Sequence, residues 1–311
     1  MSSDTTATNH LPGDLAALIA ARYDVTITSC EPMLGGYDTW ARKWLAETSR
    51  GELVIRADAR VPAGSGQWTG QMVASANRAG VPCMTPLRTQ SGRFAVGFQG
   101  GAVSLMGYAL GQVLDRNNAR EVESAATALA RLHTRVPLPR RDRPSPSPWD
   151  ARFFPGDYDP EPLLDAGLDS WQTEFAQSGR DRRRGLVHGD FYAANMICRD
   201  EAVVAIIDWA EARVDIIARE LAFSIWEFGH NEAADALEPD RARTFVAAYR
   251  RAVGGTLEPG FADLLVPLMR AELRVNVRYA LAAHDPPEAH IQAGYRAFAD
   301  LVDLDAAALL A

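Results

Sequence analysis

The chain of 311 residues is 47% hydrophobic and 23% charged, and it carries a formal net charge of −8. These values fit a globular protein with one large domain or two lobes. The negative charge argues against a general nucleic-acid binder, because a phosphate backbone requires clustered Lys and Arg, and it favours neutral or cationic partners. The scattered cysteines, Cys30, Cys83 and Cys198, predict neither a disulfide framework nor a zinc site.

The N-terminal stretch MSSDTTATNHLPGD has no basic flank followed by an apolar run, so it does not resemble a signal peptide. No uninterrupted apolar stretch approaches the roughly 20 residues that cross a bilayer. We therefore expect a cytoplasmic protein that binds neither a membrane nor nucleic acid and is a monomer or homodimer.

The first third of the chain predicts a small, mostly antiparallel sheet. A short helix is expected at 14–21, with Asp14 near its N-terminus. Alternating apolar and polar residues, broken by glycine-rich and polar turns, then predict successive strands, and one helix interrupts them before Gly80. The expected strands are 24–33, 39–47, 51–58, 93–98 and 102–108, and the interrupting helix is 65–80.

Helices are expected to dominate the chain after residue 118. An apolar stripe with helical spacing predicts a helix over 118–134. Five prolines in 136–150 predict an extended loop or linker. Three or four further helices are expected between Ile216 and Leu310. A β-rich part followed by a mainly helical part indicates an α+β protein with two lobes.

The stretch LVHGDFYAANMI, residues 186–197, places polar residues between apolar ones. One interpretation is structural: His188, Gly189 and Asp190 form a turn, and Asp190 caps the next element of the chain. The other is chemical, because Asp190 and Asn195 are five residues apart, as in the H-R-D-x-x-x-x-N loop of kinases. In that loop the Asp orients the attacking hydroxyl group and the Asn binds a metal ion.

A predicted hairpin comes after Asn195, with strands at 196–198 and 203–207 around the turn RDEA. This hairpin would bring Asp208 back towards Asn195. A carboxylate at the end of an apolar strand is costly to bury unless something pairs with it. Mg²⁺ bound to nucleotide phosphates would pair with it, since Mg²⁺ prefers oxygen ligands. The pattern therefore predicts that Asn195 and Asp208 bind Mg²⁺.

HGDFYAANMI followed by IIDWAEA resembles the aminoglycoside phosphotransferase family, which includes choline kinase-like and homoserine kinase-like enzymes. LARLHT, VDIIARELA and GVPCMTPL resemble further stretches of that family. The resemblance implies ATP or GTP with Mg²⁺ as cofactors, Asp190 as the catalytic residue, and Asn195 and Asp208 as metal ligands. It also implies a bilobal protein-kinase-like fold, with a β-sheet N-lobe at 1–105, a hinge at 106–111 and a mainly helical C-lobe at 112–311.

The resemblance also assigns a nucleotide site to the N-lobe. The glycines of LGGYD could cover phosphates with backbone N–H groups, or form an ordinary β-turn. Arg56 occupies the position where the family commonly has a phosphate-binding Lys, and arginine keeps that charge. The helix at 65–80 lacks the Glu that would pair with this cation, although the Gln71 amide oxygen could accept a hydrogen bond from Arg56 without neutralising its charge. The predicted nucleotide-binding residues are Gly35, Gly36, Tyr37, Arg56, Met106 and Tyr108.

Residues on the C-lobe helices are expected to line the acceptor pocket, as in the family, or to be ordinary residues of amphipathic helices. These candidates are Trp226, Glu227, Glu272 and Arg274. His188 is expected to brace the catalytic loop, and His133 to interact with a helix C-terminus. The charged run RDRRR at 180–184 favours a solvated surface over an anion site.

These features predict an ATP- and Mg²⁺-dependent O-phosphotransferase that acts on a small molecule. The acceptor would be an amino-sugar antibiotic or a similar hydroxylated amine, with a homoserine- or choline-type kinase as the alternative. A non-catalytic nucleotide-binding module is a further alternative, since the helix Glu is missing and Arg replaces Lys. A protein kinase is disfavoured, because no A-P-E-like segment occurs after Asp208.

Overall fold

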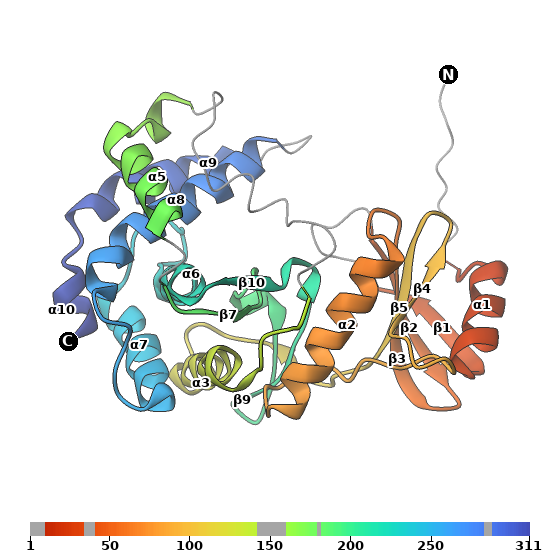
Figure 1. The fold of residues 1–311 in the computed structure, drawn as a ribbon. Coiled ribbons are helices and arrows are strands. Elements are labelled where there is room, and N and C mark those ends of the chain that lie inside the picture. The colour runs from red at the N-terminus through yellow and green to blue at the C-terminus, as the bar shows by residue number, and fades with distance from the viewer. Residues whose placement is uncertain (1–9, 34–40, 142–159, 179–181, 283–287) are drawn as a thin grey trace, which may run out of the picture. The chain divides into compact units, whose positions relative to one another are not determined.

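A computed structural model of the chain describes residues 10–33, 41–141, 160–178, 182–282 and 288–311. The chain divides into two compact units. The first consists chiefly of Met1–Arg78 and Cys83–Leu110, and the second of Ala79–Pro82, Gly111–Asp142 and Pro146–Ala311. Each unit has its own elements, which Figure 1 labels along the chain.

The first unit contains a five-stranded antiparallel sheet in the order β1-β2-β3-β5-β4. Trp44 of the second strand pairs with Ile55 of the third, and both side chains are buried in the core. The strands are β1 (Ile27–Pro32), β2 (Ala41–Thr48), β3 (Gly51–Asp58), β4 (Ala95–Phe98) and β5 (Gly101–Gly107).

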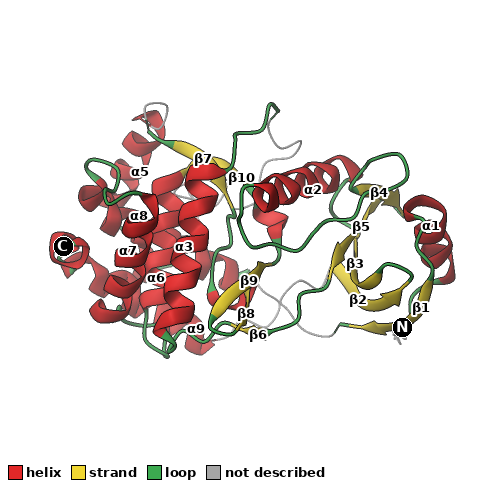
Figure 2. Ribbon diagram, turned by 90° about the horizontal axis from the view of Figure 1, so that it is seen from below, coloured by secondary structure: helices red, strands yellow, loops and turns green. Residues whose placement is uncertain are grey.

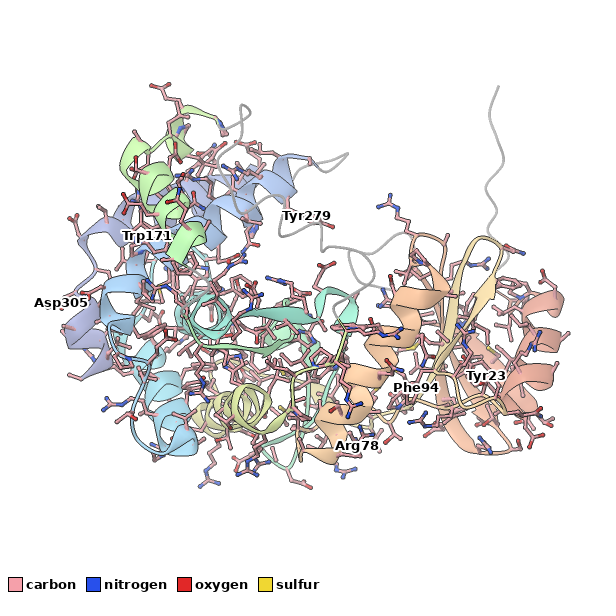
Figure 3. The ribbon with its side chains drawn as sticks, in the orientation of Figure 1. Tyr23, Arg78, Phe94, Trp171, Tyr279 and Asp305 are labelled. Carbon is pink, nitrogen blue, oxygen red and sulfur yellow. The ribbon has the colours of Figure 1, made fainter. Side chains whose placement is uncertain are left out.

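Two helices, α1 (Gly13–Tyr23) and α2 (Ala63–Arg78), lie on opposite sides of this sheet (Figure 1). Leu15, Ile19 and Tyr23 of α1 join the buried core, and the Tyr23 hydroxyl donates to the carbonyl oxygens of Val103 at 3.1 Å and Phe94 at 3.2 Å. Tyr23 and Phe94 are labelled in Figure 3. The sheet is thereby covered on both faces.

Helix α2 approaches the segment before β4 so closely that a glycine is required there. A Cβ atom on Gly70 would lie 2.4 Å from the Cβ atom of Phe94. The neighbouring Gln67 accepts a hydrogen bond from the backbone N–H of Phe94 at 2.6 Å. A larger residue at position 70 would therefore push α2 away from the sheet.

The second unit is mainly helical, and α3, α6, α7 and α8 lie side by side in it (Figure 2). Helix α3 starts at the Asn118 cap, whose side chain accepts a hydrogen bond from the N–H of Arg120 at 3.1 Å. The helices are α3 (Ala119–Arg135), α5 (Ala166–Ser178), α6 (Ile217–Gly229), α7 (Pro239–Val253), α8 (Phe261–Leu281), α9 (Glu288–Asp300) and α10 (Ala306–Leu310).

Two small sheets accompany these helices and carry the polar motif. Strand β7 (Arg184–Val187) pairs antiparallel with β10 (Arg213–Ile216). Strand β8 (Met196–Arg199) lies between β6 (Gln112–Val113) and β9 (Ala202–Ile206). Every expected strand has a counterpart, with shifts of a few residues at its ends.

The helices after Ile216 exceed the expected three or four, since the described part of the chain contains five. Helix α5 was not expected from the sequence. Its buried residues Leu168, Gln172 and Phe175 nevertheless have helical spacing. No helix among the described residues is long and apolar enough to span a bilayer.

Candidate functional site

The polar motif begins where strand β7 ends. Leu186 and Val187 are buried, and Val187 pairs with Arg213 of β10. Gly189 then turns the chain with φ +83°, and a Cβ atom at this position would lie 2.4 Å from the carbonyl oxygen of Glu211. Only glycine fits both this backbone conformation and this space. The turn positions Asp190 at the start of the loop that leads to Asn195.

Asp190 and Asn195 are joined directly. The Asn195 amide nitrogen Nδ2 donates to the backbone oxygen and to the Oδ2 atom of Asp190, both at 2.9 Å. A 3₁₀ turn, Ala193–Asn195, brings the two side chains together. Because both Nδ2 bonds go to Asp190, the amide oxygen of the buried Asn195 is left for a different partner.

The hairpin of β8 and β9 places Asp208 beside this pair. Met196 pairs with Ile206, and the N–H of Ile207 donates to the carbonyl oxygen of Asn195 at 2.9 Å. Asp208 then adopts φ +57°, which turns the chain away from the strand direction. The His188 ring donates from Nε2 to the Ile207 carbonyl oxygen at 2.9 Å, which fixes the loop to the hairpin, as expected for a bracing histidine.

The electrostatics of Asp190 show that these carboxylates gather in one place. Burial raises the pKa of Asp190 to about 7, the hydrogen bond from Asn195 lowers it, and the negative charges of Asp208, Glu211 and Glu220 raise it. Like charges close together favour protonation unless a cation compensates them. The cluster therefore favours a bound cation.

The donor atoms here fit Mg²⁺, which takes oxygen ligands from one or two side chains and completes its shell with water and phosphate oxygens. Asn195 offers an amide oxygen and Asp208 a carboxylate. A site built from protein ligands alone would require more: the described residues contain no group of three or more His, Cys, Asp and Glu that could hold a metal ion. The pair thus suits a metal ion that arrives with a nucleotide.

A buried hydrogen-bond chain braces the loop from behind. Glu220 of α6 accepts from the backbone N–H of Gly189 at 2.6 Å with Oε1, and its Oε2 lies 2.8 Å from Nε2 of His133 at the end of α3. The other His133 nitrogen, Nδ1, lies 2.8 Å from the hydroxyl oxygen of Tyr249 on α7. The sequence analysis expected His133 to interact with a helix C-terminus and did not predict this series of hydrogen bonds.

Two predicted acceptor residues lie at the C-terminal end of α6. Trp226 is buried and its ring centroid lies 5.4 Å from that of His230. Glu227 is half-buried, and burial raises its pKa to about 8; the charge of Asp190 raises it and that of Arg116 lowers it. Arg116 also donates to the Glu227 carbonyl oxygen at 3.1 Å. Glu227 and Asp190 thus interact electrostatically.

The other two predicted acceptor residues lie in buried ion pairs on α8. Glu272 pairs with Arg219 at 3.0 Å, and Arg219 also contacts Asp215 at 2.7 Å. Arg274 is fully buried and pairs with Asp169 of α5. Both side chains are thus held in ion pairs within the fold, and their role in binding the acceptor stays a prediction.

The predicted nucleotide residues of the first unit are only partly described. Arg56 on β3 forms an ion pair with Asp58 at 3.1 Å, so the carboxylate missing from the helix is supplied two residues further along the same strand. Gln71 is exposed on α2. Met106 pairs with Val54 within the sheet. The N–H of Tyr108 donates to the Glu52 carbonyl oxygen at 3.1 Å, and Gly35, Gly36 and Tyr37 lie outside the described residues.

A model of the phosphotransferase enzyme family matches residues 31–259. A homoserine kinase of Methylorubrum populi is 27% identical over 194 residues, which are 58% of this chain and 58% of that protein. Another, of Rhodopseudomonas palustris, is 26% identical over 83% of this chain and 80% of that protein. The first of these alignments thus spans little more than half of each protein.

Solved structures show the same fold at lower identity. An amicoumacin kinase in complex with AMP-PNP, Ca²⁺ and Ami has a TM-score of 0.67 at 12% identity, over 97% of this chain and 98% of its own. A choline/ethanolamine kinase family protein of Mesorhizobium loti has a TM-score of 0.61 at 16% identity, over 96% of this chain and 98% of its own. A spectinomycin phosphotransferase in complex with ADP and spectinomycin has a TM-score of 0.57 at 14% identity, over 97% of this chain and 98% of its own. The predicted α+β, protein-kinase-like fold is confirmed.

Proposed function

Because the chain belongs to the phosphotransferase enzyme family, we propose that it transfers the γ-phosphate of ATP or GTP to a hydroxyl group of a small molecule. The observation that carries this proposal is the hydrogen-bonded Asp190–Asn195 pair with Asp208 beside it. A pure nucleotide-binding module has no need of a carboxylate in the position of Asp190. Phosphate transfer that requires both Mg²⁺ and Asp190 would separate the enzyme from such a module.

Each side chain has a distinct task in this proposal. Asp190 accepts a hydrogen bond from the acceptor hydroxyl and holds its oxygen in line with the γ-phosphate. Asn195 and Asp208 would bind Mg²⁺, which neutralises charge on the β- and γ-phosphate oxygens. Arg56, held by Asp58, and the backbone of Gly35 and Gly36 would bind phosphates. Positioning and electrostatic stabilisation then supply most of the acceleration.

Tyr37 would close the phosphate-binding turn in this proposal, and Met106 and Tyr108 would contact the nucleobase. Met106 and Tyr108 belong to the segment 106–111, which would form the hinge between an N-lobe at 1–105 and a C-lobe at 112–311. These roles rest on the family resemblance. In the structure, Met106 pairs with Val54 in the sheet, and the N–H of Tyr108 donates to the Glu52 carbonyl oxygen.

The acceptor is proposed to be a hydroxylated amine, since Glu227 provides a half-buried carboxylate within electrostatic reach of Asp190. Burial disfavours the charged form of this carboxyl group, and a cationic ammonium group would offset that cost. Amino-sugar antibiotics carry such groups. Homoserine and choline-type alcohols do so as well, and the homoserine kinases among the relatives favour including them in an acceptor screen.

Asp208→Asn is expected to weaken Mg²⁺-dependent nucleotide binding about 10–100-fold, which corresponds to about 1.5–3 kcal/mol for a lost charged interaction. Nucleotide binding without Mg²⁺ should change little, because the carboxylate acts through the metal. Calorimetric titrations of ATP with and without Mg²⁺ would measure both values. Equal weakening under the two conditions would argue against a metal ligand at this position.

Glu227→Gln is expected to raise the KM for an amine-bearing acceptor about 10–100-fold, because a charged hydrogen bond contributes about 1.5–3 kcal/mol. The KM for ATP should not change. The matched control is Glu174→Gln, an exposed glutamate of α5. If acceptors with and without an amine lose affinity equally, Glu227 does not recognise the ammonium group.

A further inference from the structure

A cavity lies in the helical unit, between the C-terminal end of α5 and the segment that joins α7 to α8. Its volume is about 660 Å³, which is ample for a small metabolite. None of the residues that line it is a predicted catalytic, metal, nucleotide or acceptor residue. They are Ser178, Arg182, Arg183, Thr256, Leu257, Glu258 and Pro259.

Two oppositely charged side chains in this cavity lack partners that they need. Arg182 Nε and Glu258 Oε2 are shielded from solvent, and neither atom has a hydrogen-bond partner among the residues described. Leaving a buried polar atom unsatisfied costs about 1–3 kcal/mol, and more for a charged group. Both side chains are only half-buried, so the rest of each remains accessible from the cavity. A bound ligand could therefore satisfy both groups after small side-chain rotations.

The surroundings hold these groups in place. The Arg182 guanidinium lies 5.1 Å from the ring centroid of the buried Phe175, and the Ser178 hydroxyl donates to the Phe175 carbonyl oxygen at 3.2 Å. Arg183 adds a second positive charge. The run at 180–184 was expected to be a solvated surface. Arg183 and Arg184 are exposed, as expected, but Arg182 departs from that expectation because it packs against α5.

The charges indicate which chemistry would bind. Guanidinium groups favour a carboxylate, which they can bind through two parallel N–H donors. Glu258 would repel a simple anion, and the two arginines would repel a simple cation. A ligand that carries a carboxylate and an ammonium group a few atoms apart would match both sides. Free α-amino acids are small molecules of this kind, with both groups on one carbon atom.

The cavity is connected to the catalytic loop. The charges of Arg183 and Glu258 both act on the buried hydroxyl of Tyr249, the last member of the chain that runs through His133 and Glu220 to the N–H of Gly189. In addition, the N–H of Ile217, the first residue of α6, donates to the Arg183 carbonyl oxygen at 3.1 Å. Helix α6 also carries Glu220, so a change at Arg183 reaches the brace by two routes.

We propose that this cavity is a regulatory site for a free α-amino acid, with Arg182 and Arg183 binding the carboxylate and Glu258 binding the ammonium group. Its occupant acts on the loop through the Tyr249–His133–Glu220 chain. This proposal does not depend on which acceptor the protein phosphorylates.

The test uses the full chain carrying Asp190→Asn, without nucleotide, and calorimetric titration with glycine, L-serine, L-threonine and L-lysine. Propionate and propylamine serve as analogues with a single charge. We expect at least one amino acid to bind, both analogues to bind at least tenfold more weakly, and Arg182→Gln or Glu258→Gln to weaken binding at least tenfold. Arg243→Gln, which removes an exposed ion pair on α7, is the matched control and should have no effect.

Hydrogen–deuterium exchange of the Gly189 amide reports on the regulatory role independently of any phosphotransfer. Saturating ligand should change its exchange rate several-fold, and Glu258→Gln should abolish this change. Binding of no amino acid overturns the proposal, and so does binding that Glu227→Gln abolishes and Glu258→Gln leaves intact, since the ligand would then occupy the acceptor site. Binding without a change at Gly189 overturns the regulatory role. If either Arg182→Gln or Glu258→Gln does not fold, the other variant serves in its place, because each removes one charge of the Arg182 and Glu258 pair.

Discussion

Asp190→Ala is expected to lower the rate of phosphate transfer about 10²–10⁴-fold, the range for a positioned group that handles a proton in the transition state. Nucleotide affinity should remain within a few-fold of the wild-type value, because Asp190 is proposed to contact the acceptor and not the metal ion. The loop should keep its shape, since Asn195 Nδ2 also donates to the backbone oxygen of residue 190, which the substitution retains.

The measurements are initial rates with saturating ATP, Mg²⁺ and acceptor, and calorimetric binding of ATP with Mg²⁺ to the same samples. Asp240→Ala, at a fully exposed carboxylate on α7, is the matched control and should leave both values unchanged. A rate within tenfold of wild type would remove Asp190 from the mechanism. No turnover by the wild-type chain on any hydroxylated amine would instead favour a nucleotide-binding module.

The loop and hairpin were predictable because their geometry is local. Asp190 and Asn195 are close in sequence, and a short turn between two apolar strands leaves few ways to place Asp208. The requirement for glycine at position 189 is different. It depends on the carbonyl oxygen of Glu211, which a distant strand pairing brings to the site. The motif thus predicts a chemistry, and tertiary contacts explain why position 189 tolerates no residue other than glycine.

The brace behind the loop was not predictable for the opposite reason. Glu220 and His133 are 87 residues apart, and His133 and Tyr249 are 116 apart. In the sequence each of them is an ordinary residue of an amphipathic helix, and only the packing of α3, α6 and α7 brings them together. The same applies to Glu272, whose acidity suggested substrate binding and whose partner Arg219 lies on another helix.

The carboxylate partner of Arg56 shows a third kind of limit. The family analogy places such a partner on the helix, and sequence reasoning therefore looked for it there. Asp58 was visible two residues away on the same strand face, where alternation directs both side chains to one side of the sheet. The physical periodicity of a strand was the better guide here.

Glu220→Ala is expected to lower the free energy of unfolding by about 2–6 kcal/mol, because it removes the buried carboxylate that accepts two hydrogen bonds, at about 1–3 kcal/mol for each buried donor. The N–H of Gly189 and the ring nitrogen of His133 would both lose the carboxylate oxygen that they contact. Tyr249→Phe removes only the far end of the chain and should cost about 0.5–1.5 kcal/mol. Glu201→Ala, which breaks an exposed ion pair with Arg120, should change stability by at most about 1 kcal/mol.

Urea unfolding of the wild type and these three variants would measure the changes in the free energy of unfolding. Steady-state kinetics would separate a role in positioning the loop from simple stabilisation of the fold. If Glu220 positions the loop, Glu220→Gln should lower kcat while the KM for ATP stays within a few-fold, because the metal and nucleotide groups remain in place.

The expected loss of kcat in Glu220→Gln follows from the positions of the protons in the hydrogen-bond chain. With its proton on Nε2, His133 donates to Glu220 and accepts from Tyr249, but a glutamine that accepts from Gly189 must turn its NH₂ group towards the same nitrogen. The imidazole proton would then have to move to Nδ1, and the Tyr249 hydroxyl would have to accept instead of donate. An unchanged kcat in a well-folded Glu220→Gln variant would show that the chain stabilises the fold without setting the position of Asp190.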